Sequence, residues 1–136
     1  MEITPAEIKT AYTKAFKVSW LAKMLGVFQL TNLKYNPLNW DEVAEIIAID
    51  QTNRMEWKYN EYEKFTCADF SYSLMGAFHR YQTTAAMPIF ICWVITPQGG
   101  HSVLSFYDEG QIFLIEPQND EVFSPPKDWT LKLLNG

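Results

Sequence analysis

The sequence predicts an α+β domain, in which helices come first and an antiparallel sheet follows. Apolar residues recur at helical spacing up to about residue 81, and the pattern changes to that of strands from about residue 87. No internal repeat or linker divides the chain. Runs of helices followed by runs of strands are typical of α+β folds. We therefore expect one domain over residues 1–136, with a helical half at about 1–81 and a sheet half at about 87–136.

The first helix is predicted over residues 5–25. Thr4 is a candidate N-cap, Pro5 suits the first helical position, and Glu7 stands where a capping box needs an acidic side chain. Gly26 is expected to end the helix. The apolar residues with near-helical spacing are Ile8, Tyr12, Ala15, Phe16, Leu21 and Leu25.

A second helix is predicted over residues 40–51, with Asn39 or Asp41 as its cap. Residues 52–65 are mixed in character and indicate a helix end followed by an irregular loop. Three aromatic side chains in this stretch either line a substrate groove or, as is commoner, fill one side of the core. They are Trp57, Tyr59 and Tyr62.

The central helix is predicted over residues 66–81. Thr66 fits an N-cap, and Asp69 follows three residues later as the second half of a capping-box pair. A stripe of large apolar residues spaced four apart gives this helix a buried face. The stripe consists of Phe70, Leu74 and Phe78.

The sheet half begins with a continuous apolar run over residues 88–96, which is typical of a buried strand. Strands over 101–107 and 111–116 follow, joined by the turn sequence Asp-Glu-Gly. A Pro-Pro turn and a short last strand, within residues 124–134, complete the prediction.

The composition excludes several classes of protein. Hydrophobic residues make up 48% of the chain, so it is globular, and the net charge of −5 argues against nucleic acid as a main partner. No apolar run is long enough to cross a bilayer, and the N-terminus lacks the order of a signal peptide, so we expect a cytoplasmic protein without a membrane partner. The sequence also lacks phosphate-loop and zinc-ligand patterns, so no cofactor or metal site is predicted from it. It does not indicate an oligomeric state.

Cys67 is the candidate nucleophile. It falls in the first turn of the central helix, where unpaired N–H groups and the helix dipole stabilise an anion and lower the pKa of a thiol. The same N–H groups are placed to hold a developing oxyanion. The alternative is that Cys67 is a buried apolar side chain, as most lone cysteines are. Cys92, in the middle of the strand over 88–96, is interpreted in that way.

His101 is the candidate base. His79 stands twelve residues after Cys67 on the same helix, which places it roughly 18 Å away along the axis, too far to act on the thiol. His101 comes instead from a strand, directly after Gly99 and Gly100. A base delivered by a strand to a cysteine at a helix N-terminus is the arrangement that thiol catalysis needs.

Glu116 is the candidate partner of His101. If the turn of the hairpin is Glu109-Gly110, the strands pair so that Glu116 and Gln118 lie on the same face as His101. A carboxylate there accepts from the imidazole and stabilises its charged form. A three-residue turn would introduce a bulge and change this register. Alternatively, Glu116 is a solvated strand terminus, and His101 satisfies a backbone carbonyl.

Residues 65–120 resemble a known family of enzymes, and the similarity lies in the segments "TCADF", "GGHSVLSFY" and "IFLIEPQND". In this order they resemble papain-like and transglutaminase-like cysteine enzymes, and especially small phage and bacterial papain-fold domains and the protease domain of a fungal agglutinin. The resemblance implies Cys67 as nucleophile, His101 as base and acid, and Glu116 as the orienting group. A calcium requirement is implied by the resemblance only. The stretch before Cys67 lacks the Gln of the papain pattern, so a second oxyanion donor is unassigned.

These inferences predict cysteine-dependent acyl transfer, with hydrolysis of a peptide or amide in a protein or peptide substrate as the main hypothesis and transamidation as its variant. Gln118 is an auxiliary residue of the predicted triad. Two alternatives remain open at this point. In the first alternative the domain is an inactive binding module, for instance in a phage particle. In the second it is a purely structural protein.

Overall fold

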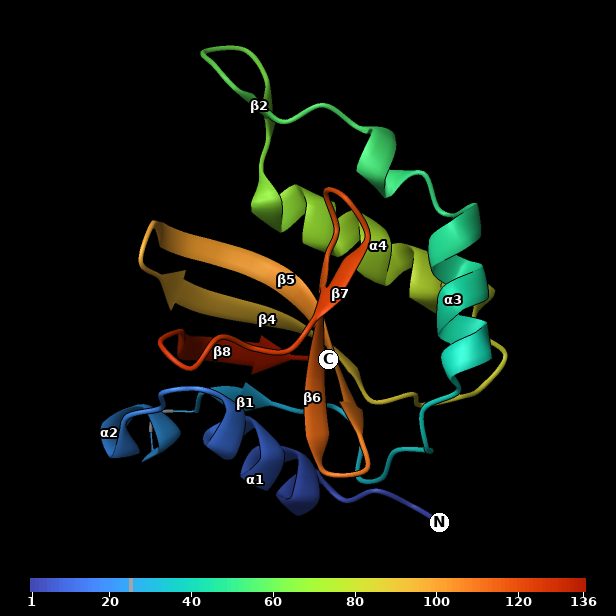
Figure 1. Cartoon of the computed structure of the whole chain (residues 1–136), viewed down its shortest axis with the longest axis vertical. Helices are drawn as coiled ribbons and strands as arrows, with labels where there is room; N and C mark the ends of the chain where they lie inside the picture. Colours follow the sequence, from blue (N-terminus) through green and yellow to red (C-terminus); the bar gives the residue numbers. More distant parts are fainter. Residues whose placement is uncertain (25) are drawn as a thin grey trace.

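Six strands of the described chain form one sheet in the order β1-β8-β4-β5-β6-β7 (Figure 1). The computed structural model describes residues 1–24 and 26–136, without the side chains of residues 21 and 22. The strands are β1 (Phe28–Gln29), β4 (Ile89–Thr96), β5 (Gly99–Asp108), β6 (Gln111–Glu116), β7 (Glu121–Phe123) and β8 (Thr130–Asn135). All neighbouring pairs are antiparallel except β1 and β8.

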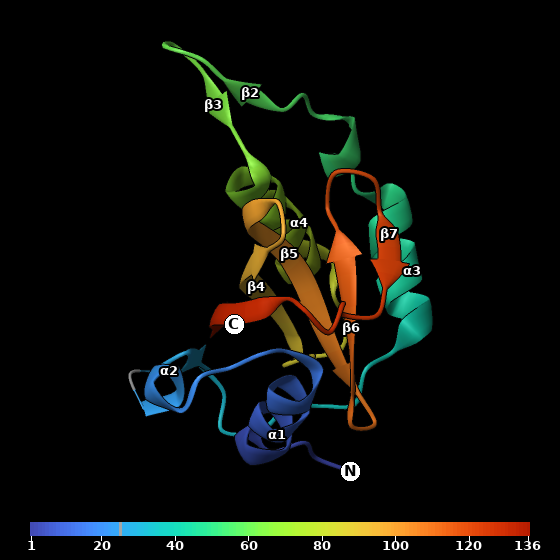
Figure 2. The same cartoon turned by 60° about the vertical axis from the view of Figure 1, so that its left-hand side comes forward.

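Helices cover both faces of this sheet, as the views in Figures 1 and 2 agree. They are α1 (Pro5–Ala15), α2 (Trp20–Met24), α3 (Trp40–Ile49) and α4 (Cys67–Tyr81), with a 3-10 turn over Thr52–Arg54. Alternate residues of β4 enter two separate cores, because successive side chains of a strand point to opposite faces. Phe90 and Cys92 pack with α1, whereas Ile89 and Ile91 pack with α3 and α4. The α+β prediction is confirmed. Within the described residues, no helix combines the length and the apolar character needed to cross a membrane.

The central helix forms as predicted and begins at Cys67. Thr66 is its N-cap, and the backbone N–H of Thr66 donates to the Asp69 carboxylate at 2.8 Å. This capping box satisfies N–H groups that a helix terminus otherwise leaves unpaired. The predicted stripe is buried, with Phe70, Leu74 and Phe78 each at most 2% exposed.

The first helix is shorter than the sequence predicted, because α1 ends at Ala15. Its Thr4–Glu7 capping box is present, but the chain turns extended at Phe16. The Lys17 N–H then donates to the Trp129 carbonyl at 3.0 Å, and the Leu131 N–H donates to the Lys17 carbonyl at 2.9 Å. This long-range pairing with β8 outweighs local helix propensity, and a separate short helix, α2, follows. The predicted end at residue 25 lies outside the described residues.

Three further predictions need correction. The helix α3 ends at Ile49 instead of residue 51, although Asn39, one of its two predicted caps, is confirmed, since its side chain accepts from the Glu42 N–H at 3.2 Å. The sheet is not confined to the second half of the chain, because β1 joins it from the helical half. The predicted irregular loop before Cys67 contains a short hairpin of β2 (Lys58–Tyr59) and β3 (Lys64–Phe65).

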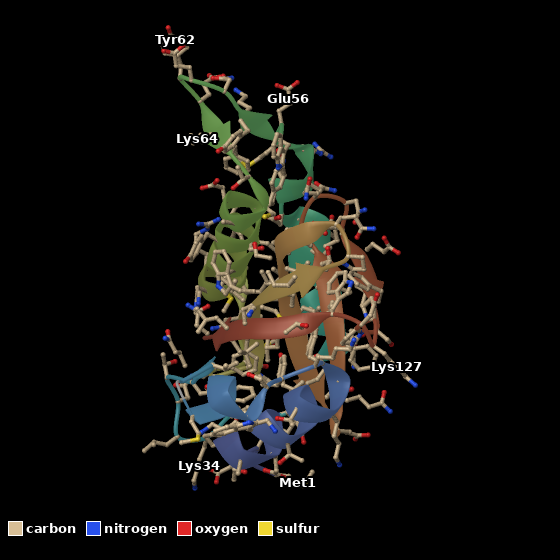
Figure 3. All side chains as sticks on the ribbon, turned by 90° about the vertical axis from the view of Figure 1, so that its left-hand side faces the viewer. Met1, Lys34, Glu56, Tyr62, Lys64 and Lys127 are labelled. Atoms are coloured by element: carbon tan, nitrogen blue, oxygen red, sulfur yellow. The ribbon has the colours of Figure 1, made fainter. Side chains whose placement is uncertain are left out.

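This hairpin projects from the body of the protein, with Tyr62 at its tip (Figure 3). Asn60 shapes the turn, because its side-chain oxygen accepts from the N–H groups of Tyr62 and Glu63 at 2.9 and 2.8 Å. Trp57, Tyr59 and Tyr62 are 54%, 66% and 88% exposed. The interpretation that these aromatics fill the core is therefore wrong.

Glu42 fastens α3 to the segment between α4 and β4. Its carboxylate accepts from the backbone N–H groups of Thr83 and Thr84, and the residue is 7% exposed. Burial raises the pKa of Glu42, but the hydrogen bonds from Thr84 and Thr83 outweigh burial and lower it to about 2. Because this pKa is depressed in the folded state, the carboxylate stabilises the fold above its ordinary value of 4.5 and progressively less as pH falls towards 2.

We expect Glu42→Ala to lower the free energy of unfolding by about 1–3 kcal/mol at pH 7, because the backbone N–H groups of Thr83 and Thr84 lose their charged acceptor. Urea denaturation measures this difference, which should shrink between pH 5 and pH 3. Glu45→Ala, on the exposed side of the same helix, is the matched control and should change stability little. A Glu42 effect that is independent of pH would contradict the assigned role of the charge.

Candidate active site

The N-terminus of α4 lies beside the start of β5, next to the β4–β5 turn, in both Figure 1 and Figure 2. Cys67 is the first residue of α4, and His101 and Ser102 are near the start of β5. Gly99 has a φ of +120°, which residues with a side chain rarely adopt, so the turn into β5 requires glycine there. The helix start and the turn together bring the thiol and the imidazole to the same place.

The sulfur of Cys67 is partly buried, and several polar groups surround it. Burial raises the pKa of this thiol, but hydrogen bonding to His101 and to the backbone N–H and hydroxyl of Ser102 outweighs burial, so the pKa falls below its ordinary value. The free N–H groups of the helix N-terminus favour the same anion. Cys67 is thus the thiol of this chain whose surroundings favour a thiolate, whereas complete burial raises the pKa of Cys92.

The imidazole of His101 joins the thiol to a carboxylate. Its Nε2–H donates to Oε2 of Glu116 at 2.6 Å, and the two side chains are only 22% and 17% exposed. With Nε2 as the donor, Nδ1 is left to interact with the thiol. The hydrogen bond to Glu116 raises the pKa of His101, burial opposes this, and the interaction with Cys67 adds to the increase. His101 therefore does not bond to a backbone carbonyl through Nε2, as the structural alternative required.

Glu116 is itself held in place. Its second oxygen, Oε1, accepts from the backbone N–H and from the side-chain amide of Gln118, each at 3.3 Å. The hairpin has the two-residue turn, since Asp108 pairs with Gln111 and both Glu109 and Gly110 have positive φ. The predicted register is thus present, and the structure brings Cys67, His101, Glu116 and Gln118 together.

Sequence reasoning missed two buried serines. The hydroxyls of Ser71 and Ser102 lie 3.0 Å apart, and both residues are 0% exposed. Ser71 is one helical turn after Cys67, and Ser102 follows His101 directly. The only signal in the sequence was this adjacency, because small polar residues in a strand and a helix carry no distinctive pattern.

Trp129 was also missed as part of the site. Its ring meets the imidazole of His101 edge-on, with centroids 6.3 Å apart and planes at 90°. This edge-on contact helps to fix the orientation of the imidazole that donates to Glu116. Trp129 is held by the backbone pairing with Lys17, a contact that no local pattern reveals.

The other candidates lie elsewhere. His79 is in the last turn of α4, and Cys92 is 0% exposed in the core between β4 and α1. Among the described residues, no three His, Cys, Asp or Glu side chains are grouped so that they could hold a metal ion.

The surroundings of Cys67 predict how its reactivity depends on pH. We expect iodoacetamide to alkylate Cys67 with an inflection below the ordinary thiol value of about 8.5, and at least about 100 times faster at pH 7 than it alkylates Cys92. Mass spectrometry of peptides from protein labelled at several pH values measures both rates. An inflection at or above 8.5, or similar slow labelling of both cysteines, would contradict the assignment.

The Ser102 hydroxyl provides a sharper test of the same environment. Ser102→Ala should move the inflection to higher pH and slow alkylation at pH 7 about threefold to tenfold, because the thiolate loses a hydrogen bond. Ser105→Ala is the matched control, since Ser105 is equally buried on β5 but bonds to Tyr12 and to the Phe90 carbonyl. If both variants slow alkylation equally, the change comes from altered packing and not from a lost hydrogen bond to the thiolate.

Solved structures resemble this chain over almost its whole length. PSL1a in complex with E64 superposes with a TM-score of 0.73 at 18% sequence identity, covering 99% of this chain and 51% of that one. A Polyporus squamosus lectin bound to a human-type influenza-binding epitope superposes with a TM-score of 0.72 at 16% identity, covering 99% and 49%. This chain thus spans about half the length of those chains. No protein-family profile matches the sequence, and no curated protein does.

The likeness extends to the first 60 residues, for which the sequence resemblance offered nothing. The mostly antiparallel sheet and the helix that begins at Cys67 agree with this likeness. The chain therefore has a papain-like α+β fold similar to that of PSL1a, a Polyporus squamosus lectin.

Proposed function

We propose that the chain is a cysteine-dependent acyl-transfer enzyme, and that its main reaction is hydrolysis of a peptide or amide bond. The observation that carries this proposal is the position of His101, which donates to Glu116 at 2.6 Å and also interacts with a thiol whose pKa is lowered. A nucleophile, a base and an orienting carboxylate in this order are the parts that thiol catalysis needs.

The proposed reaction begins when the Cys67 thiol transfers its proton to Nδ1 of His101. The thiolate then attacks the carbonyl carbon, and the backbone N–H of Cys67, at the start of α4, stabilises the negative oxygen. The imidazolium returns its proton to the leaving amine, and the C–N bond breaks to leave an acyl-enzyme. A water molecule, deprotonated by His101, attacks the thioester and releases the acid and the free thiol. An amine in place of water gives transamidation.

Three further side chains support the proposed reaction. Glu116 keeps Nε2 protonated, so that Nδ1 is the atom that exchanges protons with the thiol. Gln118 holds the carboxylate, and Ser102 stabilises the thiolate between turnovers. We place this chemistry in a reducing compartment such as the cytoplasm, where the thiol stays free.

The comparison with PSL1a supports the proposal, because that protein forms a complex with E64, a cysteine-protease inhibitor. A similar backbone therefore presents a site to an inhibitor of this class. Because this chain spans only half of that protein, its substrate is proposed from its own site alone, as a peptide segment of a protein.

E64 labelling tests the proposal directly. We expect intact-mass spectrometry to show one E64 per chain and no labelling of Cys67→Ala. Glu116→Gln should label at least about tenfold more slowly, because the charged form of the imidazole loses the carboxylate that stabilises it. Cys92→Ala is the matched control and should label normally, provided that circular dichroism shows it folded.

Hydrolysis is then measured by incubating the protein with a mixture of peptides and identifying cleaved products. Products that require Cys67 support hydrolysis, and products extended by an added amine support transamidation. If folded protein neither labels with E64 nor acts on any peptide, the inactive binding module replaces the enzyme as the interpretation.

A further inference from the structure

A pocket of about 410 Å³ lies against His101 on the side of Trp129. Its wall is formed by the ends of β4, β5 and β6 where they meet, by the turn between β6 and β7, by β7, and by Trp129 directly before β8. His101 lines the pocket and Cys67 does not, so the pocket borders the imidazole but not the sulfur. The lining residues that matter for its chemistry are Gln98, His101, Glu116, Glu121, Phe123 and Trp129.

The position of the pocket indicates which part of a substrate would fill it. In thiol catalysis the imidazolium gives its proton to the leaving amine, so the leaving amine must lie against the histidine. The residue that carries this amine extends away from the sulfur, past His101. The pocket is the space available to that residue, and its volume is within the range of small-molecule sites.

The pocket carries a negative charge that the triad does not use. Protonated His101 and Glu116 compensate each other, whereas Glu121 has no cationic neighbour among the described residues that line the pocket. Glu121 is directly opposite Glu116 in the pairing of β6 with β7, so the two side chains share one face of the sheet. The Glu121 N–H donates to the Asn119 side chain at 2.9 Å, which fixes the backbone at this point.

Aromatic rings complete the wall next to this charge. Trp129 and Phe123 contact each other edge-on, with centroids 5.9 Å apart, and both line the pocket. Aromatic rings beside a carboxylate suit the long apolar stem and the charged end of Arg or Lys, because the rings contact the stem and attract the cation.

We propose that this pocket binds the residue on the leaving-amine side of the cleaved bond and selects Arg or Lys at that position. The assignment of the leaving-amine side rests on the proposed function, whereas the preference for a cation rests on the pocket alone. Glu121 and Trp129 are the specificity-determining residues, and Glu121 acts as the counterion.

Binding to the unreactive Cys67→Ala protein tests the preference without any turnover. Argininamide mimics a leaving residue with its free amine, and norleucinamide carries the same free amine but has an uncharged side chain. We expect argininamide to bind about fivefold more tightly than norleucinamide, with weakening at high salt. Titration followed by NMR measures this, because the indole N–H of Trp129, assigned with Trp129→Phe, should shift.

Glu121→Gln should remove the difference between the two probes, while Glu45→Gln, exposed on α3 and outside the pocket, should preserve it. Equal binding of both probes, no binding of argininamide, or an unaltered preference in Glu121→Gln would each overturn the proposal. These outcomes are independent of E64 labelling. If argininamide binds selectively and Cys67 does not label, the enzyme fails but the cation pocket stands.

Discussion

The site depends on the register in which β5 pairs with β6. His101 and Glu116 meet because the strands are joined by a two-residue turn, in which Glu109 and Gly110 both have positive φ. A slip of one residue would move Glu116 to the opposite face of the sheet, because side chains alternate along a strand. A turn at the far end of the hairpin thus decides whether the imidazole finds a carboxylate. The donors from Gln118 then hold that carboxylate at the other end.

The second constraint is the position of α4 over the sheet. Its apolar stripe packs on β4 and β5, while the buried hydroxyls of Ser71 and Ser102 join helix and strand close to the thiol. Burial alone would make Cys67 an ordinary unreactive cysteine. Hydrogen bonding to His101 and Ser102 reverses that effect, so the same packing that buries the sulfur also supplies the groups that favour its charged form.

The N-terminal segment supports the site from the other side of the sheet. Lys17 pairs with the backbone on both sides of Thr130, which fixes Trp129 against His101. The fold is similar to that of PSL1a over 99% of this chain, although the two sequences are only 18% identical. The contacts are made largely by backbone atoms and by general apolar packing, which tolerate extensive change of side chains.

Local patterns in the sequence were sufficient for a large part of the fold and the site. The capping boxes at Thr4 and Thr66, the apolar stripe of α4 and the Glu109-Gly110 turn act over a few residues, so each could be read directly. Cys67, His101, Glu116 and Gln118 followed from them, since a helix start and a hairpin register place these side chains.

Tertiary structure alone decided the rest. The end of α1 at Ala15, the addition of β1 to the sheet, and the places of Ser102 and Trp129 all depend on partners far away in the chain. Such contacts have no spacing or composition by which a single sequence could reveal them. The sequence by itself determined which groups are available and which face each occupies, whereas long-range packing decided how closely they meet and what surrounds them.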